Sequence, residues 1–203
     1  ARAIHERSAR AGGPFVAINC AALAEPLLEA ELFGYEPGAF TGGAPGGHAG
    51  LMAAAEGGSL FLDEIGELAQ PLQAVLLRVL QERVYRRVGG SRDLGMDARI
   101  IAASNRELAT AVEQGRFRED LFYRLNVMSL SVPPLRARRE DIPELAVHFL
   151  RRFGEEFGKT FQGFTEPAMR RLVEAPWPGN VRELKNTIER AALLSNDPLV
   201  RPE

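Results

Sequence analysis

The feature that most constrains the fold is the order of apolar segments along the chain. Up to about residue 132, short apolar runs typical of buried strands alternate with amphipathic segments typical of helices. The strand-like runs are residues 14–18, 59–62, 99–103 and 126–132. Because their apolar residues are continuous rather than alternating, we expect strands buried on both faces of a mainly parallel sheet. The first part of the chain is therefore predicted to be α/β.

After the segment PPLRARRED at residues 133–141, the pattern is helical only. The helix-like segments of the whole chain are residues 25–33, 70–84 and 107–115 in the first part, and 141–157, 165–175 and 180–195 in the second. This change of pattern predicts two domains, an α/β domain at 1–138 and a smaller helical domain at 139–203.

Charge and cysteine content exclude several classes of protein. The chain has 25 Lys and Arg against 27 Asp and Glu, so it has no overall basic surface for nucleic acid or an anionic membrane. Cys20 is alone, and His5, His48 and His148 lie far apart, so neither a disulfide nor a metal-ligand cluster is expected. No apolar run approaches ~18 residues. We expect a cytoplasmic protein without a membrane span or signal peptide.

Polar side chains follow three of the strand-like runs. They are Asn19, the pair Asp63 and Glu64, and the pair Ser104 and Asn105. Because ligands of open parallel sheets bind at the carboxyl ends of the strands, we expect these side chains to gather at one edge. Asp63 is suited to holding Mg²⁺, directly or through its water shell, and Glu64 to accepting a proton from an attacking water. The alternative is that both carboxylates only cap the next helix.

A phosphate-binding loop of the form G-x-x-x-x-G-K-[ST] is the other part that a nucleotide site needs. The chain has only two lysines, Lys159 and Lys185. The segment GEEFGKT at 154–160 has one residue too few between its glycines and follows a charged helical segment, so we interpret it as a helix end and a loop. The glycine-rich segment 38–50 has no lysine. We therefore expect the phosphate loop to precede Ala1.

Five motifs in order resemble those of one protein family over essentially the whole chain. They are ELFGYEPGAFTGG, AEGGSLFLDEIGEL, AASNREL, FREDLFYRLNV and WPGNVRELKNTIERA. They resemble the GAFTGA loop, Walker B segment, sensor I, arginine-finger helix and sensor II of the AAA+ central domain of bacterial enhancer-binding proteins, the NtrC-like activators of sigma-54 RNA polymerase. The resemblance implies an AAA+ P-loop-type parallel sheet with a smaller C-terminal α-helical lid domain.

The resemblance also implies roles for the strand-end residues. Asp63 would organise Mg²⁺ through its water shell, and Glu64 would activate the hydrolytic water. Asn19 would hold Glu64 in alternative orientations according to the nucleotide state. Ser104 and Asn105 would sense the γ-phosphate of ATP.

Further residues are assigned to nucleotide through the same resemblance. Arg118 and Arg124 would reach the nucleotide of a neighbouring subunit, and the sequence does not decide which of them is the arginine finger. Their alternative is a surface ion pair with a nearby carboxylate. Gly57 and Gly58, in the Walker B motif, and Arg182, in sensor II, would contact the bound ATP.

The local sequence around Arg182 supports the assignment independently. The segment PWPGNVREL predicts a helix start with Asn180 as N-cap and Glu183 as its capping partner. Arg182 then lies in the first turn, where the helix dipole disfavours a cation, so we expect an anionic partner. Trp177 is interpreted as a core anchor of the helical domain.

The glycine-rich loop is expected to be a mobile contact with another protein. Its motif consists of Gly38, Ala39, Phe40, Thr41, Gly42 and Gly43. Nothing nearby in sequence buries Phe40 or Thr41, and in the family the corresponding loop touches sigma-54. Gly43 stands where the family usually has Ala, and the following APGGHAGLMAA lacks the usual Arg and Phe-Glu. The alternative is a turn-rich connector.

The resemblance implies ATP-dependent remodelling of sigma-54 RNA polymerase closed complexes, with ATP and Mg²⁺, by subunits assembled into a ring of six or seven. DNA would be contacted only through a domain outside this chain. The alternative is a non-hydrolysing AAA+ regulatory or interaction module with a diverged loop. A glycine-rich loop with lysine upstream of Ala1 would favour the ATPase.

Overall fold

The computed structural model describes residues 1–201, which form two compact units, one at Ala1–Ser129 and one from Leu130 onward. Each unit has its own hydrophobic core. The domain boundary predicted at residue 138 lies inside the second unit. Within the described residues, no helix combines the length and the apolar character that crossing a bilayer requires.

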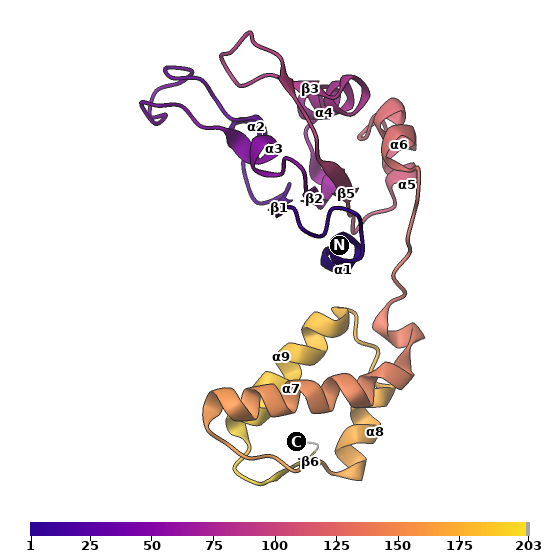
Figure 1. Ribbon diagram of the computed structural model, residues 1–203. Helices are drawn as coiled ribbons and strands as arrows, with labels where there is room; N and C mark the ends of the chain where they lie inside the picture. Colours follow the sequence, from indigo (N-terminus) through magenta and orange to yellow (C-terminus); the bar gives the residue numbers. More distant parts are fainter. Residues whose placement is uncertain (202–203) are drawn as a thin grey trace. The chain divides into compact units, whose positions relative to one another are not determined.

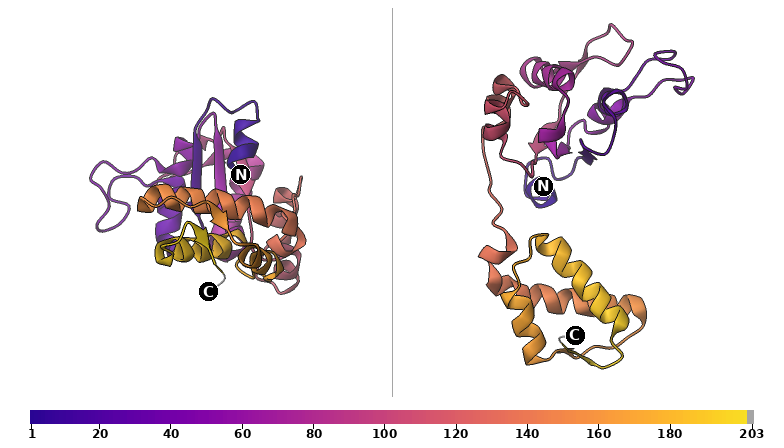
Figure 2. Two further views of the ribbon diagram at one scale, coloured as in Figure 1. Left: turned by 90° about the horizontal axis from the view of Figure 1, so that it is seen from below. Right: turned by 180° about the vertical axis from the view of Figure 1, so that it is seen from behind.

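A three-stranded parallel sheet organises the first unit (Figure 2). Its strands, in the order β1-β2-β5, are β1 (Phe15–Asn19), β2 (Ser59–Asp63) and β5 (Arg99–Ala102). The register places Asn19 beside Asp63 and Leu62 beside Ala102, so the three strands end at one edge. Leu60 and Leu62 have no exposed surface, as expected for a sheet covered on both faces. Three of the four predicted strands are thereby confirmed.

Helices and short strands complete this unit (Figure 1). They are α1 (Arg2–Glu6), α2 (Glu25–Phe33), α3 (Gly50–Ala54), the 3₁₀ turn η1 (Ile65–Glu67), α4 (Gln70–Glu82), β3 (Val84–Tyr85), β4 (Leu94–Gly95), α5 (Leu108–Glu113) and α6 (Glu119–Leu125). In α4, Leu72, Leu76, Val79 and Leu80 are buried at helical spacing and form the stripe that faces the core. A proline in the first turn of α2 and of α4 fixes where each helix begins.

The strand predicted at residues 126–132 does not form, and the prediction was wrong. This segment has no regular secondary structure, and Val127 and Met128 are 84% and 81% exposed. No strand in the described part of the chain pairs with it. An apolar run becomes a strand only where a neighbour supplies hydrogen bonds to its backbone, and the run itself does not specify that neighbour.

The second unit is built around two long helices that cross, α7 and α9, with α8 beside them (Figure 1). Its elements are the 3₁₀ turns η2 (Leu135–Ala137) and η3 (Arg139–Asp141), α7 (Ile142–Phe157), β6 (Gly163–Phe164), α8 (Glu166–Glu174), α9 (Asn180–Leu194) and β7 (Leu199–Val200). Trp177 is 5% exposed within this core, and its Nε1–H donates to the Leu172 carbonyl at 2.7 Å. Its interpretation as a core anchor is confirmed.

Lys159 caps the C-terminus of α9. Helix α7 ends at Phe157, and Gly158 caps it with a positive φ of 64°. The Nζ of Lys159 then donates to the carbonyls of Ala192, Leu193 and Ser195 at 3.1, 2.7 and 2.8 Å. These carbonyls lie at the C-terminus of α9, where a cation is favoured. The interpretation of residues 154–160 as a helix end and a loop is therefore confirmed.

Candidate functional site

The carboxyl edge of the sheet brings together polar side chains from neighbouring strands. Asp63 ends β2, and Glu64 follows it in the left-handed conformation with φ 54°. Two hydrogen bonds hold this turn, from the Glu64 N–H to Asp63 Oδ1 at 3.1 Å and from the Ile65 N–H to the Ala103 carbonyl at 2.9 Å. A non-glycine residue rarely adopts this conformation, and such strain concentrates at functional sites.

Glu64 meets Asn105 across this edge. The Nδ2 of Asn105 donates to Glu64 Oε1 at 3.4 Å, from the loop that follows β5. Neither carboxylate makes a side-chain capping hydrogen bond to η1. The capping alternative for Asp63 and Glu64 therefore has no support in the geometry.

Asn19 is placed at the same edge but bonds elsewhere. Its register partner is Asp63, whereas its Oδ1 accepts from the Ala21 N–H at 2.8 Å. The resemblance assigned the orientation of Glu64 to Asn19, whereas the side chain that bonds to Glu64 in this structure is Asn105. The side chain of Asn19 instead shapes the turn that leaves β1.

Ser104 organises the loop after β5. Its Oγ donates to the Arg106 carbonyl at 2.8 Å and accepts from the Arg106 N–H at 3.1 Å. Arg106 in turn pairs with Glu67 at 2.9 Å. These contacts fix the backbone that carries Asn105.

Cys20 lies beside the carboxylates and was not singled out by the sequence. It is buried, and its N–H donates to the Asp63 carbonyl at 2.9 Å. Burial, and then the charges of Asp63 and Glu64, raise the pKa of its thiol to about 12. A cysteine directly after a buried strand was the signal that pointed to this position.

Gly57 and Gly58 lie at the opposite end of β2, which corrects their assignment to the nucleotide. They precede the strand, about five residues or roughly 17 Å from Asp63 at the rise of a β-strand. A Cβ at Gly58 would lie 2.0 Å from the Pro14 carbonyl oxygen. The absence of a side chain at Gly58 lets the strands β1 and β2 begin side by side.

The two candidate arginine fingers have different environments. Arg118 precedes α6 and is half-exposed, with Nε and Nη2 bonded to Asp120 at 3.0 and 2.8 Å. This hydrogen bonding lowers the pKa of the Asp120 carboxyl. Arg124 instead donates to the Leu80 carbonyl at 2.9 Å, against α4. The surface ion pair considered for both residues is therefore made by Arg118.

Gln73 is a buried polar residue that the sequence reasoning missed. Its Nε2 donates to the Leu68 and Arg116 carbonyls at 2.8 and 3.0 Å, and its Oε1 accepts from the Arg118 N–H at 2.8 Å. It fixes the backbone at the start of α6, and so the origin of the Arg118 side chain. A glutamine inside the apolar stripe of α4 was the available signal.

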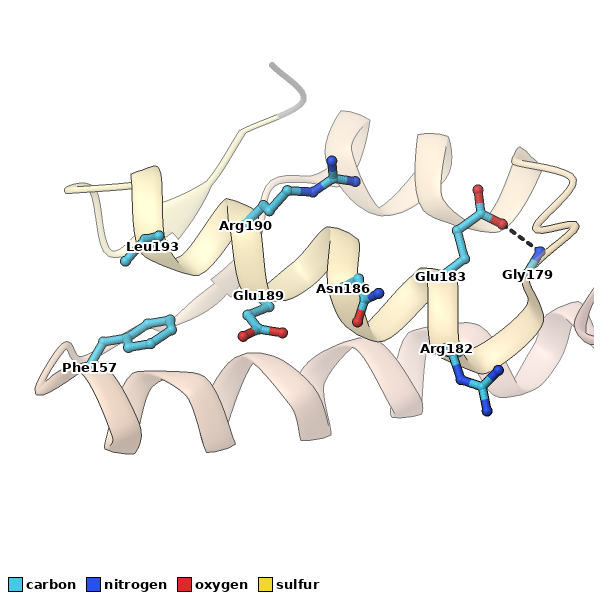
Figure 3. A pocket seen from close by; sticks show the side chains of 8 residues that line it. All are labelled: Phe157, Gly179, Arg182, Glu183, Asn186, Glu189, Arg190 and Leu193. Carbon is cyan, nitrogen blue, oxygen red and sulfur yellow. Dashed lines mark hydrogen bonds between the residues drawn. The ribbon is translucent and has the colours of Figure 1, made fainter. Parts of the chain in front are cut away.

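In the second unit, Arg182 lines a cavity of about 720 Å³ along α9 (Figure 3). The lining residues are Phe157, Gly179, Arg182, Glu183, Asn186, Glu189, Arg190 and Leu193. Arg182 lies in the first turn of α9, as predicted. Its guanidinium makes no hydrogen bond or ion pair with any other described residue, so it is available to an anion.

The helix start differs from the prediction in one respect. Gly179, and not Asn180, occupies the N-cap position, and the Gly179 N–H donates to Glu183 Oε2 at 2.8 Å (Figure 3). Asn180 adopts a left-handed conformation, and its Oδ1 accepts from the Leu135 N–H at 2.8 Å. The asparagine therefore ties α9 to η2, while Glu183 keeps its predicted capping role.

The loop between α2 and α3 has an aromatic contact of its own that the sequence did not predict. Phe40 is 41% exposed, and its ring centroid lies 4.8 Å from that of Tyr35. Phe40 is therefore not buried, as expected, although one face of its ring contacts Tyr35. Thr41 remains exposed.

Metal ligands are few in the described part of the chain. No cluster of three or more His, Cys, Asp or Glu side chains is positioned there to hold an ion. Asp63 uses one oxygen for the Glu64 N–H, which leaves its other oxygen for a cation or its water shell. Mg²⁺ commonly uses one or two carboxylates together with substrate phosphates, so this donor set fits magnesium that arrives with a nucleotide.

Comparison with known families identifies both units. Residues 1–131 match the family described as the sigma-54 interaction domain. The chain belongs to this family. Residues 136–203 match the AAA+ ATPase lid domain. The fold class predicted from the sequence, an AAA+ parallel sheet followed by a helical lid, is confirmed.

Individual relatives agree with this assignment. The chain is 54% identical to the Nif-specific regulatory protein of Herbaspirillum seropedicae over 200 residues, which cover 98% of this chain and 37% of that protein. It is 56% identical to the transcriptional regulatory protein ZraR of Escherichia coli K12 over 194 residues, 96% of this chain and 44% of ZraR. It therefore spans less than half the length of these relatives.

Solved structures show the same fold. NtrX from Brucella abortus in complex with ADP has a TM-score of 0.90 and 40% identity, covering 99% of this chain and 44% of NtrX. NtrX in complex with ATP gives the same TM-score, identity and coverage.

Proposed function

We propose that this chain is part of the ATP-hydrolysing core of a sigma-54-dependent transcription activator, which remodels the closed complex of sigma-54 RNA polymerase. The observation that carries the proposal is the contact of Glu64 with Asn105 at the carboxyl edge of the sheet. It supports the proposal because a carboxylate and an amide donor then lie at the edge where parallel sheets bind ligands. Family membership and the ATP-bound structure of NtrX support nucleotide as that ligand.

Within this proposal, Glu64 accepts the proton of the attacking water at a carboxylate oxygen. Asn105 fixes the direction of that carboxylate through its Nδ2–H. Asp63 provides the oxygen for Mg²⁺, which would neutralise charge on the phosphates when bound. Asn19 and Ser104 hold the turns that frame the edge, the latter as the proposed γ-phosphate sensor.

The arginines are proposed to complete the site. Arg182 lies in the first turn of α9, has no hydrogen bond or ion pair with the described residues, and would contact the nucleotide. Arg118 is half-exposed and would exchange Asp120 for the nucleotide of a neighbouring subunit in a ring. Arg124, which is bonded to the Leu80 carbonyl, would support α6 from within the same subunit. We therefore favour Arg118 as the arginine finger.

The same proposal implies which macromolecules the protein binds. Sigma-54 RNA polymerase would be contacted through the loop at 38–43, and self-association into a ring of six or seven would bring Arg118 to its target. As transcription takes place in the bacterial cytoplasm, we place the protein there. DNA contact is proposed for a domain outside these 203 residues.

The experiment uses a chimera in which this chain replaces the matched 194 residues of ZraR. Glu64→Gln in the chimera keeps the shape of the side chain and removes the base. We expect ATP binding to persist and hydrolysis to fall by about 10²- to 10⁴-fold, the usual contribution of general-base catalysis.

The matched control is Glu82→Gln, at a glutamate in a surface pair with Arg78. It is expected to leave both ATP binding and hydrolysis unchanged. Equal hydrolysis in the Glu64→Gln and unmodified chimeras would contradict the role of Glu64. A chimera that assembles and binds sigma-54 but never hydrolyses ATP would favour the non-hydrolysing regulatory module.

A further inference from the structure

The loop between α2 and α3 projects from the first unit, and its base is fixed by backbone hydrogen bonds (Figure 1). The Tyr35 N–H donates to the His48 carbonyl, and the His48 N–H donates to the Tyr35 carbonyl, both at 2.9 Å. The Glu36 N–H donates to the Val88 carbonyl at 3.0 Å. Tyr35 is therefore held in place at the base while the loop extends beyond it.

The side chain of Tyr35 contacts the loop at two points. Its ring centroid lies 4.8 Å from that of Phe40, at an interplanar angle of 56°. Its hydroxyl oxygen accepts from the Ala44 N–H at 3.0 Å. One side chain at the fixed base thus binds the loop both before and after its turn.

Gly43 lies beside these rings and leaves space for the Tyr35 ring. A Cβ at this position would lie 3.1 Å from Cε2 of Tyr35 and 3.5 Å from Cε2 of Phe40. A methyl group at this position would make a close contact with the ring of Tyr35, whose backbone is held by the hydrogen bonds to His48.

We propose that Tyr35 is a positioning residue that holds Phe40 folded back on the loop base, so that Phe40 must leave the Tyr35 ring to bind sigma-54. The proposal rests on the proposed function for the identity of the partner, but the folded-back contact is a property of this chain alone. An aromatic pair that must be broken before binding lowers the apparent affinity of the partner.

The first test observes the contact directly in the 203-residue chain. Phe40 is replaced by 4-fluorophenylalanine, and its ¹⁹F chemical shift is recorded. Tyr35→Leu removes the neighbouring ring and is expected to move the signal. Tyr123→Leu, at an exposed tyrosine of α6, is the matched control and is expected to leave it unchanged.

Two milder variants keep the test independent of a folding defect. Tyr35→Phe retains the ring and loses only the hydroxyl that accepts from the Ala44 N–H, so we expect a smaller change of the ¹⁹F signal. Gly43→Ala leaves Tyr35 unchanged and is expected to move the signal part of the way. A ¹⁹F signal that is the same in Tyr35→Leu, Gly43→Ala and the unmodified chain would overturn the proposal.

The second test measures sigma-54 binding with ATP, in the ZraR chimera carrying Glu64→Gln. Releasing Phe40 by Tyr35→Leu is expected to lower the Kd for sigma-54 by about 2- to 12-fold, the range that corresponds to one aromatic pair. If the ¹⁹F signal moves but the Kd does not change, Tyr35 does not restrain binding and the proposal fails. If no variant binds sigma-54 whereas ZraR does, the proposed function fails and the folded-back contact stands.

Discussion

Lys159 offers a sharp test of how the second unit is held together, because its removal separates a structural role from a phosphate-binding one. In Lys159→Met the Nζ is lost, and three carbonyls at the C-terminus of α9 lose their donor. Hydrogen bonds to charged groups contribute about 1.5–3 kcal/mol each when buried. Here water can replace the donor at the Leu193 carbonyl, where the bond is exposed, whereas the bonds to Ala192 and Ser195 are partly buried.

We therefore expect the free energy of unfolding of this unit to fall by about 2 kcal/mol, roughly one charged hydrogen bond plus the helix-dipole contribution. For a unit of this size, each kcal/mol lowers the Tm by about 4–8 °C. The assay is urea or thermal unfolding followed by the fluorescence of Trp177, which is the only tryptophan and lies in the core of this unit.

The chain offers one matched control, because Lys185 is its only other lysine. The Nζ of Lys185 lies 5.9 Å from the Phe153 ring centroid, near the limit of a cation–π contact, so Lys185→Met should cost less than about 1 kcal/mol. Equal unfolding midpoints for Lys159→Met and the unmodified chain would refute the reasoning. Loss of ATP binding without loss of stability would instead point to a phosphate ligand.

Three further predictions concern the first unit. The thiol of Cys20 is expected to resist alkylation by iodoacetamide at pH 8 in the folded chain and to react in urea, because burial and nearby carboxylates raise its pKa to about 12; equal rates would show that the thiol is accessible. Gln73→Leu leaves three backbone groups without their partner and should cost at least about 2 kcal/mol in urea unfolding, whereas an unchanged midpoint would show that water replaces the amide. Arg118→Ala should lower ATP hydrolysis in the ZraR chimera while leaving its stability within about 0.5 kcal/mol, because Arg118 forms a surface pair with Asp120. Hydrolysis that depends on Arg124 and not on Arg118 would reverse the proposed choice of finger.

The parts of the fold that follow from sequence are those fixed by local pattern. The apolar stripe of α4 and the buried run of β2 define their elements regardless of the rest of the chain. The wrong strand at 126–132 shows the limit of this reasoning. Its composition favours a strand as strongly as that of β2, but the pairing of strands is a long-range property.

The same limit applies to the site. The order of motifs places Asp63, Glu64 and Asn105 at one edge because parallel strands align their ends. Whether Asn19 or Asn105 reaches Glu64 depends on the directions of side chains in two loops. The spacing of residues in the sequence does not determine these directions. Likewise, the contact of Tyr35 with Phe40 depends on a turn that glycines allow but do not specify.

The central proposal is that ATP hydrolysis is coupled to activation of sigma-54 RNA polymerase through the loop that carries Phe40. The most direct measurement is transcription from a sigma-54 promoter by the ZraR chimera, with ATP hydrolysis assayed on the same preparations. Phe40→Ala should leave hydrolysis near that of the unmodified chimera and abolish transcription, because the loop contributes no residue to the strand-edge site. Transcription by Phe40→Ala at the unmodified rate would contradict the account.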